Sequence, residues 1–265
     1  MKEHIPDVFI IGAMKSGTTS FYNIYFNHPE ISLTKRKEHN GFIKFNKSEN
    51  IVNSYIDQFE NINKLKIDIS PKYSQLHKYP GVPQKIFSLN SEAKIIYIIR
   101  NPIERIISHY YHDMLRDRVE LEDFEELITS PNNEYIATSL YFKQIQEYLK
   151  FFKREKILIL QLEDIKTNKT KIENKIKDFL NLDSFEISNV SAYNSDARYK
   201  ILFYDRIHAL LGHSKLTKLY HLFFYLVNIK PKKPELSKHL NEKLKSMLLS
   251  DLDHLKKFFN IYYDL

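Results

Sequence analysis

Short runs of apolar residues recur along the first two thirds of the chain and predict five β-strands. Each run is rich in isoleucine, valine and leucine, and turn-forming or charged residues bound it. Unbroken runs such as IIYII indicate strands that are buried on both faces, which is typical of a parallel sheet. The predicted strands cover residues 8–12, 30–34, 66–70, 94–99 and 156–162.

Segments with apolar residues at spacings of three and four lie between these strands and predict helices over 18–27, 102–116 and 139–152. The second of them starts with a proline, which fits the first turn of a helix. Strands that alternate with helices predict an α/β fold with right-handed crossovers. We expect a P-loop-like domain with a central parallel sheet of about five strands flanked by helices.

Beyond residue 163 the pattern is helical, and we find neither an internal repeat nor a linker rich in glycine, serine or proline. The predicted helices there cover residues 170–181, 196–211, 215–228 and 235–260. We therefore expect a single domain over residues 1–265. Its α/β core would span about 7–183, and a helical cap would follow over about 184–265.

Composition narrows the classes of function. The 265 residues carry a net charge of +7, which favours anionic ligands such as nucleic acid, acidic polysaccharide or a polyphosphorylated nucleotide. The absence of cysteine excludes disulfides, thiolate catalysis and cysteine-ligated zinc. No apolar run reaches the roughly 18 residues of a membrane span, and residues 1–7 are unlike a signal peptide. We expect a soluble cytoplasmic protein of bacterial or similar type.

The stretch FIIGAMKSGTTS, residues 9–20, predicts an anion site. A buried strand leads through a glycine-containing loop into a helix, and this layout points backbone N–H groups at an anion. The chain has only five glycines, so Gly12 and Gly17 within six residues indicate a backbone requirement. The stretch is no Walker A loop, because Thr18 follows Gly17 and the only lysine, Lys15, precedes it. An N-capped helix with a solvated lysine is the structural alternative.

Polar residues also follow the other predicted strands, and carboxyl ends of parallel strands meet at one edge of the sheet. Arg100 ends the fourth strand, where its planar guanidinium suits a phosphate, and Ser108 lies two turns into the next helix. A surface salt bridge from Arg100 to Glu104 is the alternative. The groups that we expect at this edge are Lys15 to Ser20, Lys35 to His39, Ser70 to Tyr73, Arg100, Arg105, Ser108 and His109.

These segments together resemble a known family. FIIGAMKSGTTSF resembles the 5'-phosphosulfate loop of sulfotransferases that use 3'-phosphoadenosine 5'-phosphosulfate (PAPS), and AKIIYIIRNPIERIISHYYH resembles their 3'-phosphate-binding strand and helix. RKEHNGFIKF and DISPKY are similar to the KEPxFF and E-K-S-P-x-Y segments of the carbohydrate branch, which includes heparan-sulfate-type enzymes. The resemblance runs over about residues 7–183.

The resemblance implies roles for individual residues. Lys15 would stabilise the bridging oxygen as the sulfuryl group leaves, and Glu38 would be the general base, with His39 as its rival. The implied donor-binding residues are Lys15, Ser16, Gly17, Thr18, Thr19, Ser20, Arg100, Ser108 and Tyr141. The implied acceptor-binding residues are Lys37, His39, Ser70 and Lys72.

The sequence departs from the family pattern in its third segment, where Asp68 replaces a glutamate and Ile69 replaces a lysine. Lys72 is one substitute for that lysine. The basic turn KPKKP at 230–234 lies where relatives have a loop over the nucleotide, so Lys232 or Lys233 could reach a phosphate; a solvated turn is the alternative.

We therefore expect an enzyme that moves the sulfuryl group of PAPS to an acceptor hydroxyl on a glycan, acidic or lipid-linked, and releases adenosine 3',5'-bisphosphate. No metal and no nucleic acid are expected. Residues 215–233 have an apolar centre and basic flanks, so they form either a buried helix or a peripheral membrane contact. The rival functions are a P-loop kinase and a non-enzymatic binder of RNA or acidic polymer.

Overall fold

The computed structural model describes residues 2–26, 28–116, 118–131, 133–187 and 232–265. Its centre is a five-stranded sheet in the order β2-β3-β1-β4-β5, and all of its strand pairs are parallel. This confirms the predicted α/β fold. The strands are β1 (Val8–Gly12), β2 (Ile31–Leu33), β3 (Leu65–Ile69), β4 (Lys94–Ile99) and β5 (Ile157–Gln161).

The unbroken apolar runs reflect burial on both faces of the sheet. Phe9 and Ile11 of β1 belong to one hydrophobic cluster, whereas Val8 and Ile10 belong to the cluster on the opposite face. All four side chains are fully buried. Successive residues of a strand point to opposite faces of the sheet. Because helices cover both faces, residues that point to either face are buried, and an apolar side chain is favoured at every position.

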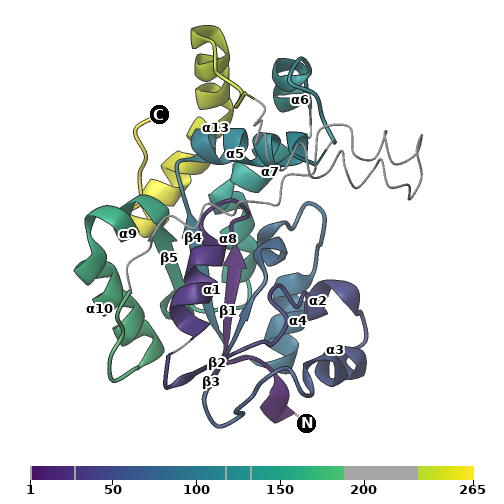
Figure 1. The fold of residues 1–265 in the computed structure, drawn as a ribbon, viewed down its shortest axis with the longest axis vertical. Helices are drawn as coiled ribbons and strands as arrows, with labels where there is room; N and C mark the ends of the chain where they lie inside the picture. Colours follow the sequence, from purple (N-terminus) through teal and green to yellow (C-terminus); the bar gives the residue numbers. More distant parts are fainter. Residues whose placement is uncertain (1, 27, 117, 132, 188–231) are drawn as a thin grey trace, which may run out of the picture.

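The face of the sheet that carries Val8 and Ile10 is covered by helices whose apolar residues belong to the same, smaller cluster. Phe21 and Tyr25 of α1 pack there against the central strands, together with Ile172 and Ile176 of α10. In Figure 1, α1 lies over β1, and α9 and α10 lie beside β5. The helices are α1 (Thr18–Phe26), α9 (Leu162–Thr167) and α10 (Lys169–Leu180).

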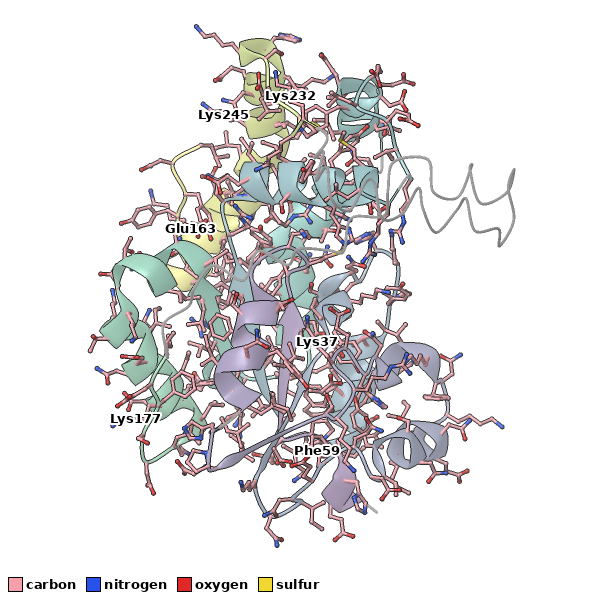
Figure 2. The ribbon with its side chains drawn as sticks, viewed as in Figure 1. Lys37, Phe59, Glu163, Lys177, Lys232 and Lys245 are labelled. Atoms are coloured by element: carbon pink, nitrogen blue, oxygen red, sulfur yellow. The ribbon has the colours of Figure 1, made fainter. Side chains whose placement is uncertain are left out.

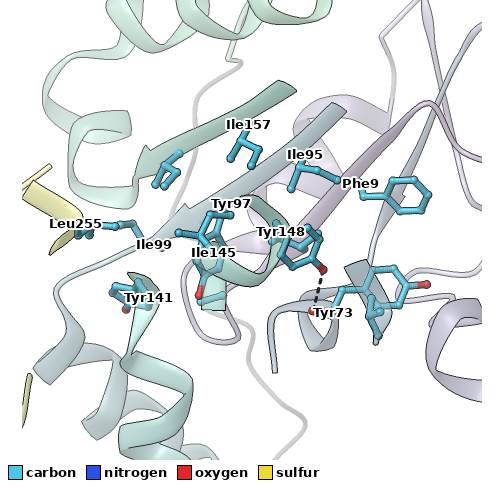
Figure 3. Close-up of a cluster of buried hydrophobic side chains, with 14 of the residues drawn as sticks. Phe9, Tyr73, Ile95, Tyr97, Ile99, Tyr141, Ile145, Tyr148, Ile157 and Leu255 are labelled. Carbon is cyan, nitrogen blue, oxygen red and sulfur yellow. Dashed lines mark hydrogen bonds between the residues drawn. The ribbon is translucent and has the colours of Figure 1, made fainter. Parts of the chain in front are cut away.

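The opposite face, which carries Phe9 and Ile11, holds the larger hydrophobic cluster, shown in part in Figure 3. Tyr97 of β4, Tyr148 of α8 and Leu255 of α13 are buried in it, and the Tyr148 hydroxyl donates to the Tyr73 carbonyl at 2.9 Å. The helices on this side and at the edge of the sheet are α2 (Gly41–Lys44), α3 (Ser48–Tyr55), α4 (Val82–Leu89), α5 (Pro102–Met114), α6 (Phe124–Thr129), α7 (Glu134–Ser139), α8 (Tyr141–Leu149) and α13 (Lys238–Phe259). Short 3₁₀ helices cover Lys2–His4, Pro71–Ser74 and Arg154–Lys156.

The helix predicted over 139–152 is wrong as a single element. Leu140, with φ −77° and ψ 77°, interrupts it, so α7 ends at Ser139 and α8 begins at Tyr141. Asp251 of α13 caps this start, because its carboxylate accepts the backbone N–H groups of Phe142 and Lys143, in the first turn of α8, at 2.9 and 2.8 Å. A carboxylate from a distant helix is not visible in the local sequence pattern.

The C-terminal prediction is tested only in part. The helix predicted over 235–260 exists as α13, which begins at Lys238 because the Ser237 hydroxyl caps it by accepting the Leu240 N–H. The helices predicted over 196–211 and 215–228, and with them the membrane hypothesis for 215–233, lie outside the described residues except for its last two lysines. Lys232 is exposed and pairs with Glu235 at 3.1 Å. Within the described ranges, no helix is long and apolar enough to span a bilayer.

Candidate active site

The strand order places a switch point at the centre of the sheet. β1 lies between β3 and β4, so the chain crosses from one side of β1 to the other between these two strands. Ligands of open α/β sheets bind beyond the carboxyl ends of the strands at such a point. The loop of residues 13–17 follows β1 and Arg100 follows β4, so the fold brings the two predicted phosphate-binding segments to one edge. In Figure 1 the arrow of β1 points toward this edge, where α5 and α7 lie.

Two glycines allow the β1–α1 loop (residues 13–17) to turn at this edge. Gly17 has φ +83°, a left-handed conformation that favours glycine, and a Cβ there would lie 2.7 Å from Leu162 Cδ1. A Cβ on Gly12 would lie 2.3 Å from the Ser74 Oγ. The close spacing of these glycines in the sequence therefore has a structural cause in both backbone conformation and space.

The start of α1 presents unused hydrogen-bond donors. The N–H groups of Ser20 and Phe21 donate to the Gly17 carbonyl at 2.9 and 3.3 Å, so those of Gly17 to Thr19 precede the first helical bond. The buried Ser16 Oγ has no hydrogen-bond partner among the described residues. This donor set, together with the positive end of the helix dipole, suits the phosphate end of a nucleotide.

Arg100 follows the last residue of β4, and its side chain contacts the β1–α1 loop. Its Nη1 donates to the Lys15 carbonyl at 3.4 Å, its Nη2 pairs with Glu104, and its Nε has no partner in the described part of the chain. The Tyr141 hydroxyl donates to the Arg100 carbonyl at 2.9 Å. The expected salt bridge with Glu104 thus exists, but the guanidinium also lies against the β1–α1 loop, within reach of a ligand there.

Positive charges crowd the Lys15 ammonium. Its pKa is lowered, first by burial and then by the charges of Arg116 and Arg100, while Asp113 acts in the opposite direction. An excess of cations around a partly buried ammonium is unfavourable until an anion enters. The electrostatics of this edge therefore fit a ligand with several negative charges.

Arg105 was expected at this edge of the sheet, but sequence reasoning gave it no individual role. Its guanidinium is fully buried and donates to the Ser139 Oγ at 2.6 Å, to the Tyr135 carbonyl at 2.5 Å and to the Met14 carbonyl at 3.5 Å. No carboxylate pairs with it among the described residues, and burial lowers its pKa to about 10. The signal in the sequence was a charged residue beside Ile106, within the buried stretch of α5.

The loop after β2 lies against the same site. The Lys37 ammonium donates to the Thr19 Oγ1 of α1 at 2.7 Å. The next residue, Glu38, is half-buried and has φ +57°, and Asn40 has φ +58°. The Asn40 side-chain amide donates to the Glu38 carbonyl at 2.7 Å, which holds this bend. The loop therefore places the Lys37 ammonium at the start of α1, and Glu38 is the next residue along the chain.

Asp68 anchors this loop from β3. Its buried carboxylate accepts hydrogen bonds from the Tyr55 hydroxyl at 2.6 Å, the Tyr73 hydroxyl at 2.9 Å and the Ser70 hydroxyl at 2.6 Å. Burial raises the pKa of Asp68, and these three bonds oppose that rise. The Ser70 Oγ in turn accepts the Asn40 N–H at 3.0 Å. Ser70 is fully buried, so it supports the loop and does not present its hydroxyl to an acceptor.

His39 faces the core. Its Nε2 lies 3.0 Å from the Ser54 Oγ, and its ring centroid lies 4.4 Å from that of Tyr55. Burial, followed by the charges of Lys44 and Arg36, lowers the pKa of His39 to about 4. The ring is therefore neutral at pH 7, and its Nε2 already lies against the Ser54 hydroxyl, which argues against His39 as the general base.

The remaining predicted site residues differ in exposure. Ser108 is half-buried on α5, and Lys72 is exposed at the carboxyl end of β3, so both can meet a ligand. Tyr141 is fully buried, and its hydroxyl is bonded to the Arg100 carbonyl. We had expected Tyr141 beside the nucleotide; the structure places it behind Arg100, where it supports the arginine.

One group of potential metal ligands lies close to this edge. Ligand atoms of His109, Asp113 and Glu134 are within 4.8 Å of one another. Each already has a cationic neighbour: the Arg105 Nη1 is 3.2 Å from the His109 Nδ1, Arg118 pairs with Asp113, and Lys78 pairs with Glu134. These contacts account for the acidic charge of the group.

Comparisons with known proteins show the family of this chain. The family model described as "Sulfotransferase domain" matches residues 5–255. Heparan sulfate glucosamine 3-O-sulfotransferase 5 of Mus musculus is 27% identical over 257 residues, which cover 86% of this chain and 71% of the mouse protein.

Solved structures support the fold. The crystal structure of a sulfotransferase from Alicyclobacillus acidocaldarius aligns with a TM-score of 0.66 and 22% identity, over 98% of this chain and 97% of that one. The mouse sulfotransferase SULT7A1, crystallised in complex with PAP, aligns with a TM-score of 0.54 and 16% identity, over 96% of this chain and 88% of that one. Because the family model matches residues 5–255, nearly the whole length of the chain, this chain belongs to the sulfotransferase domain family.

Proposed function

We propose that this sulfotransferase moves the sulfuryl group of PAPS to a hydroxyl group of a carbohydrate and releases adenosine 3',5'-bisphosphate. The contact between the Arg100 guanidinium and the Lys15 carbonyl is the observation that supports this most directly. It joins two phosphate-binding groups that are 85 residues apart in sequence at the switch point of the sheet. A nucleotide with phosphates at both its 3' and 5' positions needs such a pair.

The two ends of the donor would have separate partners. The β1–α1 loop and the N-terminus of α1 would hold the 5'-phosphosulfate through backbone N–H groups, hydroxyls and Lys15. Arg100 and Ser108 would hold the 3'-phosphate, with Tyr141 supporting Arg100 from behind. The unpartnered Ser16 Oγ and Arg100 Nε fit such a ligand. The mouse neighbour crystallised with PAP supports the same class of donor.

The transfer itself needs charge stabilisation and one proton acceptor. The acceptor oxygen attacks sulfur in line, and the bond between sulfur and the bridging phosphate oxygen breaks. Lys15 would neutralise the negative charge that develops on that oxygen, and Glu38 would take the proton of the attacking hydroxyl. The cations of the protein would fill the role that magnesium has in nucleotide kinases.

A glycan is the acceptor that we propose. The heparan sulfate relative supports it, as does the net charge of +7, which favours an acidic polysaccharide. The kinase alternative lacks the lysine that should follow Gly17 in a Walker A loop. A non-enzymatic polymer binder does not require the built phosphate site at the start of α1.

The direct test is incubation of the protein with ³⁵S-labelled PAPS and a panel of glycans, phenols and lipids. We expect label on a glycan with the wild-type protein and none with Lys15→Ala. Label on a phenol alone would contradict the glycan acceptor. Equal labelling by the Lys15→Ala variant would reject the assigned role of Lys15.

A further inference from the structure

Lys37 reaches from the loop after β2 to the helix that receives the donor. Its Nζ lies 2.7 Å from the Oγ1 of Thr19, the second residue of α1, and Figure 2 shows Lys37 beside that helix. Because of the sequence resemblance we had expected Lys37 to bind the acceptor. The contact with Thr19 instead places the Lys37 ammonium at the N-terminus of α1, where the proposed function puts the 5' end of the donor nucleotide.

The Lys37 ammonium lacks a compensating charge. Within the described ranges no carboxylate pairs with it, and its hydrogen bond goes to a neutral hydroxyl. The residue is half-buried, so water screens its charge only in part. An ammonium has three N–H groups, and a single hydroxyl acceptor leaves donors for an anion at the same place.

No other lysine of this side of the site is equally placed. Ile69, at the carboxyl end of β3, is apolar and buried, so it offers no cation. The Lys44 ammonium is bound to the His39 carbonyl at 2.6 Å. Lys72 is exposed beyond Ser70, and within the described residues it makes no hydrogen bond to the β1–α1 loop or to α1.

The backbone of the Lys37 loop is held in place. The Asn40 N–H donates to the Ser70 Oγ, which in turn donates to Asp68 of β3. The loop is thus fixed to the sheet on one side, while Lys37 reaches α1 on the other. The adjacent Glu38 belongs to the same short segment, so its position is coupled to that contact.

We propose that Lys37 is a second donor-binding cation, which donates to a 5'-phosphate oxygen of the bound nucleotide from the side opposite to Arg100. The inference rests on the proposed function, since it assumes a nucleotide whose 5' end lies at the start of α1. In this arrangement the 5'-phosphate accepts a hydrogen bond from Lys37, and this bond helps to fix the position of the loop that carries Glu38. Lys37 would thus assist the donor side of the reaction in place of the family's third-segment lysine, where this chain has Ile69.

Nucleotide titration separates this role from acceptor binding. We would measure the affinity of Lys37→Met for adenosine 3',5'-bisphosphate and for adenosine 3'-monophosphate, which lacks the 5' group. The loss of a charge-assisted hydrogen bond weakens binding about 10- to 100-fold, and we expect that loss for the bisphosphate alone. Lys47→Met is the matched control, because Lys47 is exposed before the first residue of α3 and is not among the expected site residues, and it should bind both nucleotides as the wild type does.

The outcomes are distinguishable. Lys37→Arg should keep most of the bisphosphate affinity, since it preserves the charge. If Lys37→Met binds the bisphosphate as tightly as the wild type, or loses affinity for both nucleotides equally, Lys37 is not a 5'-phosphate ligand and the inference is overturned. If the wild-type protein binds no bisphosphate at all, the proposed function itself fails, and this inference fails with it.

Discussion

The substitution His39→Gln tests how the loop that carries Glu38 is built. The glutamine amide can replace the His39 Nε2 opposite the Ser54 Oγ, but it has no proton to gain between pH 4 and 7. In the wild-type protein, burial lowers the pKa of His39 from its ordinary value of 6.5 to about 4. The unfolded chain therefore binds a proton at this residue in a pH range where the folded chain does not.

The sign and size of the effect follow from linkage. Stability from a lowered pKa is present above pH 6.5 and is lost as the pH falls toward 4, because protons favour the unfolded state there. Between pH 7 and 5 the two pKa values give a loss of about 2 kcal/mol from this one residue, as an upper figure for a ring with some solvent contact. His77 and His109 also have lowered pKa values, so they act in the same direction as His39.

Urea unfolding at pH 7 and at pH 5, followed by circular dichroism, measures this loss for the wild type and for His39→Gln. Since the other histidines are present in both proteins, the difference between the two losses isolates His39. We expect the variant to lose about 1 to 2 kcal/mol less than the wild type over this range. Equal losses would refute the conclusion that the His39 ring is held neutral by burial behind the loop.

Three further predictions concern catalysis and the β1–α1 loop. Lys15→Ala should abolish sulfuryl transfer and leave binding of adenosine 3',5'-bisphosphate measurable by titration; retained turnover would contradict its role at the bridging oxygen. Glu38→Gln should lower kcat by about 10² to 10⁴ with little change in donor affinity, and a loss confined to affinity would count against a general base. Gly17→Ala should cost about 1 to 3 kcal/mol in thermal unfolding, because it adds strain at φ +83° and meets Leu162. Gly81→Ala, at φ +81° in open space, is its control and should cost less.

The strands and the phosphate loop were predictable from sequence because local pattern determines them. All five strands lie within two residues of their predicted bounds, since a strand buried on both faces leaves a continuous apolar run. The close spacing of Gly12 and Gly17 in the sequence also predicted backbone positions where a side chain does not fit. The convergence of this loop with Arg100 followed from the rule that ligands lie beyond the carboxyl ends of parallel strands.

Contacts between residues far apart in the sequence determine the features that the local sequence pattern did not predict. Ser70 and His39 were assigned to the acceptor, but Asp68 and Ser54 hold them inside the protein. The break at Leu140 depends on Asp251, more than a hundred residues away. Arg105 was visible as a charge near buried positions of its helix, and its contact with His109 follows helix spacing, yet its bonds to a serine hydroxyl and to backbone carbonyls follow from no spacing rule.

The central claim is that one edge of the sheet binds a nucleotide by a phosphate at each end. Calorimetric titration in the presence of EDTA tests it, with adenosine 3',5'-bisphosphate compared with adenosine 5'-monophosphate on the wild type and on Arg100→Ala. We predict that the wild type prefers the bisphosphate and that Arg100→Ala loses this preference while still binding the monophosphate. A preference that survives the loss of Arg100, or a wild type that binds both nucleotides equally, would contradict the two-ended site.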